Sequence, residues 1–179
     1  MSYLYVASSP EVSPQDRRMV RQCLTREFAL PMKELEIPAI DFAYDAGRRQ
    51  YSSIAVLEML LRLCPGDAGK LLAVTGRDLF VPVLTFVYGQ AQLSGLVAVF
   101  SLARLRQEFY GLTPNREALE ERAAKEALHE TGHLLGLVHC ADRSCAMSLA
   151  TNIGQIDSKQ AAFCAPCRAR LSRQKGVVV

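Results

Sequence analysis

The chain has 179 residues, half of them hydrophobic and 22% charged, and its formal net charge is +3. This composition can bury a sizeable core, so it excludes a disordered, collagen-like or low-complexity protein and favours a single domain. No apolar run reaches the roughly 18–20 residues that cross a bilayer, and we recognise no signal peptide, so we expect a cytoplasmic protein.

The first part of the chain alternates strand and helix patterns. Residues 3–7 form a β-prone apolar run that predicts a strand. Ser13 and Pro14 suit the N-cap and the first position of a helix that ends near residue 30. A second strand is expected over residues 35–43, with an interruption at Pro38.

The middle of the chain is expected to hold one buried helix and three strands. The helix covers residues 52–64 and is apolar nearly all round, which predicts deep burial. The strands are expected over residues 71–75, 81–88 and 96–102.

A long helix is expected next, with Thr113 as its N-cap and Pro114 at its first position. It should run to Leu135, and Gly136 should end it in the left-handed conformation. No long regular element is expected before residues 158–161, and the basic tail from residue 168 onward is expected to be frayed.

All three histidines of the chain lie between positions 129 and 139. His129 and His133 are four residues apart, so on a helix both imidazoles face the same side and can bind one zinc ion. Glu130 lies beside them, where it can hold a water at the metal without being a ligand. Gly136 allows a sharp turn that can bring His139 back as the third ligand.

Two simpler interpretations of this segment stay open. The histidines can be ordinary surface or core residues of a helix, although chance rarely produces a pattern of this length. An intact zinc site can also be inactive, because a bound metal does not by itself establish turnover.

Four of the six cysteines form two close pairs, Cys140 with Cys145 and Cys164 with Cys167. Disulfides are not expected in a reducing compartment, and two pairs of thiolates suit a closed tetrahedral structural zinc. Free buried cysteines or a redox pair are the alternatives. Because Cys140 directly follows His139, this zinc would fix the loop that carries the third histidine. The other two cysteines lie on apolar faces of expected helices and are interpreted as small core residues: Cys23 and Cys64.

The combined pattern resembles the archaemetzincins, a family of metzincin-type zinc metallopeptidases with a second, four-cysteine zinc site. The resemblance is carried by the segment from His129 to His139, by Met147 and by the two cysteine pairs, and it extends over about residues 44–167. Its weaker parts are the segments 50–53, 86–91 and 101–105, together with Asp157 and Lys159.

The resemblance implies an α/β fold, a metzincin-like single domain. Its parts are a twisted, mainly parallel sheet with an antiparallel edge strand, a backing helix, an active-site helix and a C-terminal loop region stabilised by the four-cysteine zinc site. Residues 89–91 would lie near the edge strand, where an extended peptide can add by main-chain hydrogen bonds. Met147 would lie in a turn beneath the zinc site, unless it is a plain core methionine. The expected layout is sheet and helices in residues 1–136, the zinc-bearing region in 137–170, and a tail in 171–179.

The implied function is zinc-dependent hydrolysis of peptide bonds. The expected partner is a peptide or protein substrate, with neither nucleic acid nor membrane, and two zinc ions are expected per chain, one catalytic and one structural. His129, His133 and His139 would hold the catalytic ion with one position open for water. Glu130 would act as general base toward that water and then as acid toward the leaving amine.

A competing interpretation is a non-catalytic zinc-binding module, in which the four-cysteine site and the basic tail contact a protein or a nucleic acid. Against this interpretation, the net charge is small and the basic residues of the tail are few and not interleaved with aromatic ones. It also leaves Glu130 without a role between two metal-ligand histidines. The basic residues in question are Arg168, Arg170, Arg173 and Lys175.

Overall fold

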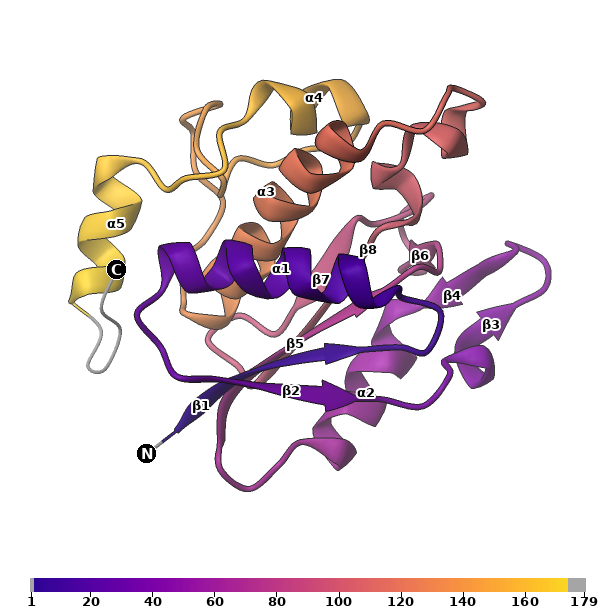
Figure 1. The fold of residues 1–179 in the computed structure, drawn as a ribbon, viewed down its shortest axis with the longest axis horizontal. Coiled ribbons are helices and arrows are strands. Elements are labelled where there is room, and N and C mark those ends of the chain that lie inside the picture. Colours follow the sequence, from indigo (N-terminus) through magenta and orange to yellow (C-terminus); the bar gives the residue numbers. More distant parts are fainter. Residues whose placement is uncertain (1, 174–179) are drawn as a thin grey trace.

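The computed structural model describes residues 2–173 and is built around a five-stranded sheet with the strand order β2-β1-β5-β8-β7 (Figure 1). Neighbouring strands from β2 to β8 run parallel, and β7 pairs antiparallel with β8 at one edge. The expected α/β fold with an antiparallel edge strand is confirmed. The strands are β1 (Tyr3–Ser8), β2 (Met32–Glu36), β5 (Ala68–Thr75), β7 (Gly89–Ala91) and β8 (Val97–Ser101).

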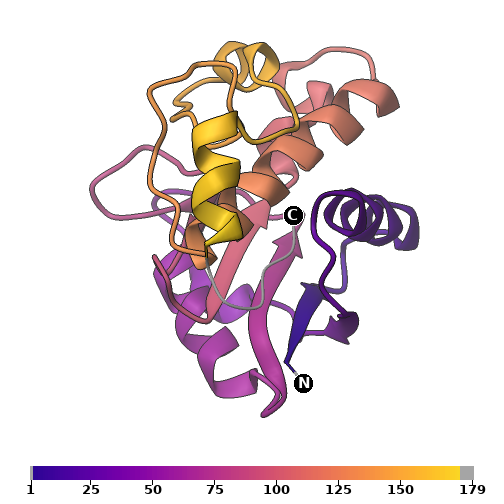
Figure 2. The same ribbon diagram turned by 90° about the vertical axis from the view of Figure 1, so that its left-hand side faces the viewer.

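Helices cover both faces of this sheet, which explains why its central strands are continuous apolar runs. Every residue of β8 is buried, and so are the last five residues of β5. Helices α1 and α3 pack on one face and α2 packs on the other (Figures 1 and 2). Their bounds are α1 (Pro14–Glu27), α2 (Ser53–Leu63) and α3 (Arg116–Leu134).

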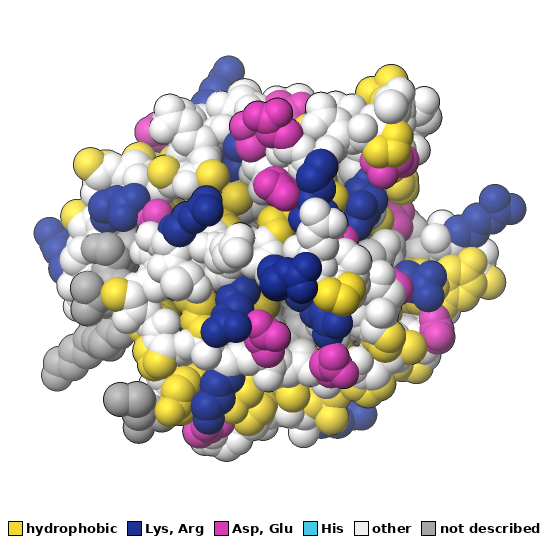
Figure 3. All heavy atoms as spheres, in the orientation of Figure 1, with side chains coloured by type: hydrophobic (Ala, Val, Ile, Leu, Met, Phe, Trp, Pro, Cys, Tyr) yellow, Lys and Arg dark blue, Asp and Glu magenta, His cyan; other side chains and the backbone are white. Residues whose placement is uncertain are grey.

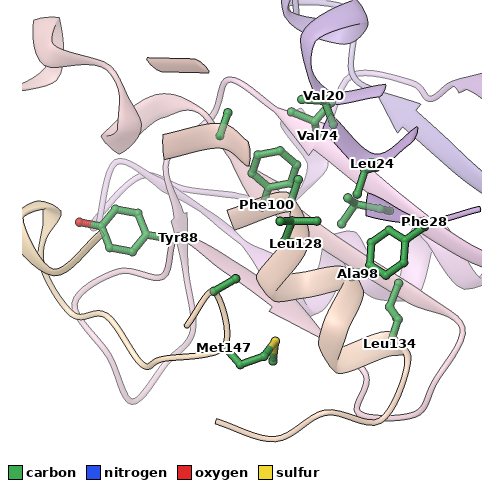
Figure 4. Packing of buried hydrophobic residues seen from close by; sticks show 14 of the residues in the cluster. Val20, Leu24, Phe28, Val74, Tyr88, Ala98, Phe100, Leu128, Leu134 and Met147 are labelled. Atoms are coloured by element: carbon green, nitrogen blue, oxygen red, sulfur yellow. The ribbon is translucent and has the colours of Figure 1, made fainter. Parts of the chain in front are cut away.

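The larger of the two hydrophobic clusters joins α1, α3 and the sheet, and it holds α3 in place. Leu24 of α1, Leu128 of α3 and Phe100 of β8 lie close together in this cluster (Figure 4). All three side chains are almost completely buried. The helix α3 is therefore fixed along its length before any metal is considered.

The N-cap residues of α1 and α3 are Ser13 and Asn115, and the second of these differs from the prediction. Ser13 caps α1 as expected. The expected start of α3 at Thr113 and Pro114 is wrong, because the side chain of Asn115 accepts the capping hydrogen bond from the backbone of Ala118 at 3.0 Å. Asparagine ranks above threonine as an N-cap, so the helix begins two residues later than predicted.

The expected strand over residues 35–43 is wrong beyond its first residues. Strand β2 ends at Glu36, and Asp41–Ala43 forms a short 3₁₀ helix on the far side of Pro38. Proline has no N–H to donate to a sheet, so the strand does not continue through it.

The expected strand over residues 81–88 is also wrong, because most of this segment is a loop whose carbonyls bind side chains instead of a neighbouring strand. The Arg48 guanidinium donates to the carbonyls of Pro82 and Leu84, both at 2.9 Å. The Gln50 amide donates to the carbonyl of Thr85 at 3.0 Å. Before the loop, a small second sheet is formed by β3 (Tyr44–Asp45), β4 (Gln50–Ser52) and β6 (Leu79–Phe80).

The helix α2 is less buried than its composition predicts. Val56, Leu57 and Leu60 pack on the sheet, but Ile54 and Leu61 are 41% and 42% exposed. Among residues 2–173, α2 is the one α-helix on this face of the sheet, and part of its outer side is left exposed.

The chain after α3 is mostly irregular and contains two short helices, α4 (Ile153–Ser158) and α5 (Ala165–Ser172). The prediction that the chain frays from residue 168 is wrong as far as Ser172, because Leu171 is fully buried and Arg168 forms a 2.7 Å ion pair with Glu27 at the end of α1. Residues 174–179, which include Lys175 and most of the expected tail, lie outside the described residues.

Charged side chains of both signs are interspersed on the face shown in Figure 3. The ion pairs Arg17–Glu36 at 2.7 Å and Arg21–Glu34 at 2.8 Å, which link α1 to β2, illustrate this mixing. Within residues 2–173, none of the helices combines the length and the apolar character that a membrane crossing needs.

Candidate active site and metal centres

The three histidines converge at the C-terminal end of α3. One ring nitrogen from each histidine lies within 4.8 Å of those of the other two, and Nε2 of His129 is 3.1 Å from Nε2 of His133. Two imidazole nitrogens that bind one tetrahedral zinc at about 2.0–2.1 Å are about 3.3 Å apart. The arrangement therefore fits a zinc ion held by His129, His133 and His139.

Two backbone carbonyls orient the histidines on α3. The carbonyl of Ala146 lies 2.8 Å from Nδ1 of His129, and the carbonyl of Leu137 lies 2.8 Å from Nδ1 of His133. A carbonyl only accepts hydrogen bonds, so Nδ1 carries the proton and Nε2 presents its lone pair to the metal position. Burial is the main cause that lowers the pKa of all three imidazoles, which favours the neutral form that a metal ligand needs.

The return of the chain to the metal position depends on Gly136, as predicted. Its φ is +82°, and the helix ends with hydrogen bonds from Gly136 to the carbonyl of His133 and from Leu137 to the carbonyl of Gly132, both at 2.9 Å. This is the Schellman arrangement, which strongly favours glycine at its left-handed position. It reverses the chain, so that His139 comes back beside the end of the helix.

Met147 is fully buried, and its sulfur packs against Gly132, between the two histidines of α3. Its side chain extends toward the end of α3 that carries Leu134 (Figure 4). A Cβ atom added to Gly132 would collide with the sulfur of Met147. The glycine between the two helix histidines therefore makes room for the methionine, as expected of a turn packed under the site.

Glu130 is a buried carboxyl group in the cleft. The side chain is 3% exposed, and its Oε2 has no hydrogen-bond partner among the described residues. A Cβ atom on Gly89 of β7 would lie only 2.5 Å from Oε1 of Glu130, so the edge strand can approach this closely only because residue 89 is glycine. Burial, followed by the charge of Glu126, raises the pKa of Glu130 well above its usual value.

The cleft in front of these residues has a volume of about 580 Å³. Its walls are β7 with the preceding loop on one side and the segment after α3 on the other. Exposed apolar side chains line both walls, while its charged lining residues are all buried. The exposed apolar residues are Leu84, Leu93, Val138 and Leu149, and the buried charged ones are Glu126, Glu130 and Lys159.

The four cysteines of the two pairs form a second cluster. Their sulfur atoms all lie within 4.8 Å of one another, and the sulfurs of Cys140 and Cys164 are 3.7 Å apart. A disulfide would place them at about 2.05 Å, whereas two thiolates on one tetrahedral zinc are about 3.8 Å apart. Backbone N–H groups of Met147 and Cys164 point at the sulfur of Cys145, both at 3.4 Å, which suits a thiolate. The cluster fits a structural zinc.

The remaining cysteines lie outside both clusters, as predicted. Cys23 donates to the carbonyl of Ala124 at 3.7 Å, and both Cys23 and Cys64 pack against the hydrophobic clusters. All six cysteines of the chain are free.

Sequence reasoning assigned no role to two groups that the fold brings to the histidines, although the resemblance included one of them, Lys159. Glu126 and Lys159 are both buried, line the cleft and form an ion pair with Nζ and Oε1 3.5 Å apart. Glu126 lies four residues before Glu130, a spacing that places both carboxyl groups on one side of the helix and that would have identified it. The resemblance included Lys159 without a role, because the fold brings it to the histidines from a distant segment.

The fold and the site together define a zinc metallopeptidase. The family model for peptidase family M54 matches residues 19–173, so the chain belongs to this family, that of the archaemetzincins. It is 42% identical to an archaemetzincin of Methanocaldococcus jannaschii over 146 residues, which covers 80% of this chain and 79% of that protein.

Solved structures agree with this assignment. The archaemetzincin of Methanopyrus kandleri superposes with a TM-score of 0.84 at 33% identity, covering 96% of this chain and 94% of the other. The archaemetzincin of Archaeoglobus fulgidus, complexed with malonate, gives 0.80 at 32% identity, covering 93% and 99%.

Proposed function

We propose that the chain hydrolyses peptide bonds with Glu130 as the general base and His129, His133 and His139 as the ligands of a catalytic zinc. The observation that carries this proposal is the buried, unpartnered Oε2 of Glu130 in the cleft, directly after the first of the three converging histidines. A carboxyl group is rarely buried without a partner unless it has a chemical role.

The residues divide the chemistry between them. When bound, zinc lowers the pKa of a water and polarises the carbonyl of the scissile bond. Glu130 accepts a proton from the attacking water and later delivers it to the leaving amine, and its raised pKa suits both steps. The walls of the cleft exclude bulk water, and β7 supports an extended peptide by main-chain hydrogen bonds.

We further propose a second, structural zinc on the four cysteines, which makes two ions per chain. The sulfur spacing and the N–H groups aimed at Cys145 support it. The free cysteines also support a reducing compartment such as the cytoplasm. The substrate is proposed to be a peptide or protein. A nucleic-acid partner gains no support, because Arg168 of the basic tail is paired with Glu27.

The test is cleavage of a peptide library by the wild type and by Glu130→Gln, each with and without a chelator. The variant should keep the fold and both zinc ions but lose about 10²–10⁴-fold in kcat, because proton transfer is lost and metal binding is not. Metal analysis of the same preparations provides the control. Equal cleavage by a zinc-loaded Glu130→Gln protein, from preparations free of contaminating proteases, would rule out the proposed mechanism.

A further inference from the structure

Lys159 is a buried ammonium group beside the histidine cluster. Its side chain is 1% exposed, and it reaches the cleft from the segment between the two cysteine pairs. A buried lysine is costly unless its charge and hydrogen bonds are satisfied. Its partners therefore indicate why the chain places it there.

Lys159 has two partners, and both lead to His129. Its Nζ lies 3.4 Å from the carbonyl oxygen of Ala146, the same oxygen that accepts the 2.8 Å hydrogen bond from Nδ1 of His129. It also lies 3.5 Å from Oε1 of Glu126, which is three residues before His129 on α3. Lys159 thus contacts the loop through the carbonyl of Ala146 and the helix α3 through Glu126, and His129 is held between these two contacts.

Both contacts are longer than the roughly 2.7–2.9 Å of a strong charge-assisted hydrogen bond. Neither contact alone fixes the ammonium, but the two together hold it between a carbonyl and a carboxylate. The carbonyl oxygen has two lone pairs, so it can accept from the lysine and the histidine at the same time. The ammonium therefore restrains the Ala146 carbonyl without displacing His129 from it.

We propose that Lys159 is a positioning residue for the histidine metal centre. It holds the Ala146 carbonyl where that carbonyl fixes the ring orientation of His129, so that Nε2 is directed at the metal. The inference rests on the proposed zinc site of the three histidines, but its test measures metal binding and does not require a known peptide substrate.

The direction in which zinc affinity changes when Lys159 is removed distinguishes a positioning role from a purely electrostatic one. A positive charge near a cation opposes its binding, so removal of the ammonium by charge alone would tighten zinc binding. Loss of a group that orients a metal ligand weakens binding instead, typically 10–100-fold.

The experiment compares wild type with Lys159→Met in competition against zinc chelators of graded affinity. The zinc dissociation constant of the histidine site is expected to rise about 10–100-fold, with no change at the cysteine site. Cobalt substitution distinguishes the two centres, because only the cysteine site shows thiolate charge-transfer absorption, and the weaker bands of the histidine site should change in the variant. Wild-type affinity or tighter binding at the histidines would overturn the proposal.

Arg122→Met is the matched control. Arg122 is also buried on α3, and it forms a two-pronged ion pair with Asp157 at 2.6 and 2.8 Å, two residues before Lys159. Loss of Arg122 weakens the attachment of the segment around residues 157–159 to α3, but it leaves the carbonyl of Ala146 without a change in its hydrogen bonds. Arg122→Met should lower the Tm and leave zinc affinity at the histidines unchanged. An equal loss of affinity in both variants would show a general effect of stability and would overturn the proposal.

A second variant covers the case in which Lys159→Met does not fold because Glu126 is left as an unpaired buried charge. The double variant Glu126→Leu with Lys159→Met removes both charges, and such replacements are often neutral for stability. It should fold and still bind zinc weakly at the histidines, and wild-type affinity would overturn the proposal. Wild type that binds zinc at the histidines but cleaves no peptide would count against the proposed function alone. Wild type that binds no metal there would overturn both.

Discussion

The sheet with helices α1 to α3 is held together by buried apolar side chains from regular elements, whereas the irregular region after α3 adds fewer apolar side chains to the same cluster and relies also on hydrogen bonds and on its cysteine and histidine clusters. In the first region, β5 and β8 are almost entirely buried and pack between two helical layers. In the second, backbone hydrogen bonds such as Ala146 to Ala162 at 2.9 Å and Cys140 to Met147 at 3.0 Å link irregular segments. The scaffold should therefore survive metal removal, and the second region should not.

The two regions meet at two points on the histidine centre. His139 is bonded directly to Cys140, and Ala146, whose carbonyl orients His129, lies between Cys145 and Met147. Closure of the cysteine site thus determines where a ligand and the orienting carbonyl lie. Loss of the cysteine site is therefore expected to disturb the histidine site, whereas loss of one histidine should leave the segments that carry the cysteines folded.

The largest effect should come from Cys164→Ser. Structural zinc sites contribute up to about 10–16 kcal/mol of apparent binding free energy in small peptides, so loss of a ligand should lower the Tm strongly and disturb both metals. His129→Ala, the matched comparison, should lose only the histidine-bound metal and keep the fold. Metal analysis and thermal melting measure both. Wild type with one zinc or none, or a Cys164→Ser protein with two, would contradict the coupling.

The next largest effect should come from Asp16→Asn, in the apolar region. Asp16 is 3% exposed and joins α1 to Arg106 at 2.6 Å and to Arg116 at the start of α3. Breaking these two ion pairs should cost about 3 kcal/mol, at the lower end for buried pairs because both arginines are one-third exposed. Zinc content should not change, which distinguishes this loss of stability from that of Cys164→Ser.

The stabilisation that Asp16 contributes should be lost at acidic pH. Burial by itself would raise the pKa of Asp16, but hydrogen bonds from Arg116 and Ser13 and the charge of Arg106 outweigh it and hold the pKa below its usual value. Its contribution is therefore complete above the unfolded-state pKa of about 3.9 and is lost as the pH falls through the lower folded-state value. Denaturant unfolding of wild type and Asp16→Asn should converge at acidic pH, and a difference that persists there would contradict the assignment.

A smaller effect is expected for Gly132→Ala, at the contact between the two regions. The added methyl would meet the sulfur of Met147, and overpacking of this kind costs about 1–3 kcal/mol. Displacement of Met147 should also weaken zinc binding at the histidines. Gly154→Ala in α4 is the control, because its nearest contact would be an ordinary one at 3.4 Å. Equal Tm values for the two variants would show that Met147 can move at no cost.

Much of the metal chemistry can be predicted from sequence because it depends on local spacing. The interval between His129 and His133, the turn at Gly136 and the Cys164–Cys167 pair are encoded within a few residues of each other. The central strands were predictable for a similar reason, since burial on both faces makes β5 and β8 continuous apolar runs.

The features that the sequence did not predict depend on contacts between distant segments. The loop over residues 81–88 has a strand-like sequence, but the side chains of Arg48 and Gln50 satisfy its carbonyls. The burial of Leu171 makes α5 a helix where composition indicated a frayed tail. Lys159 acquires its role only because folding brings it to Ala146. Residue types and short spacings do not encode such pairings.

The smallest effect is expected at the mouth of the cleft, where the two regions face each other across the substrate. Leu149, which is 57% exposed, lines the wall formed by the region after α3 and belongs to an apolar rim without exposed charges. Covering about half of a leucine by a bound peptide is worth about 1 kcal/mol, or roughly fivefold in affinity. Leu149→Ser should therefore lower kcat/KM about fivefold for peptides with bulky apolar side chains next to the scissile bond, mainly through KM, and should leave peptides with small side chains unaffected. Leu61→Ser is the control, because Leu61 is 42% exposed on α2 and does not line the cleft. If Leu149→Ser reduced cleavage of both peptide classes equally, the rim would act on the fold or the metal and not on the substrate side chain.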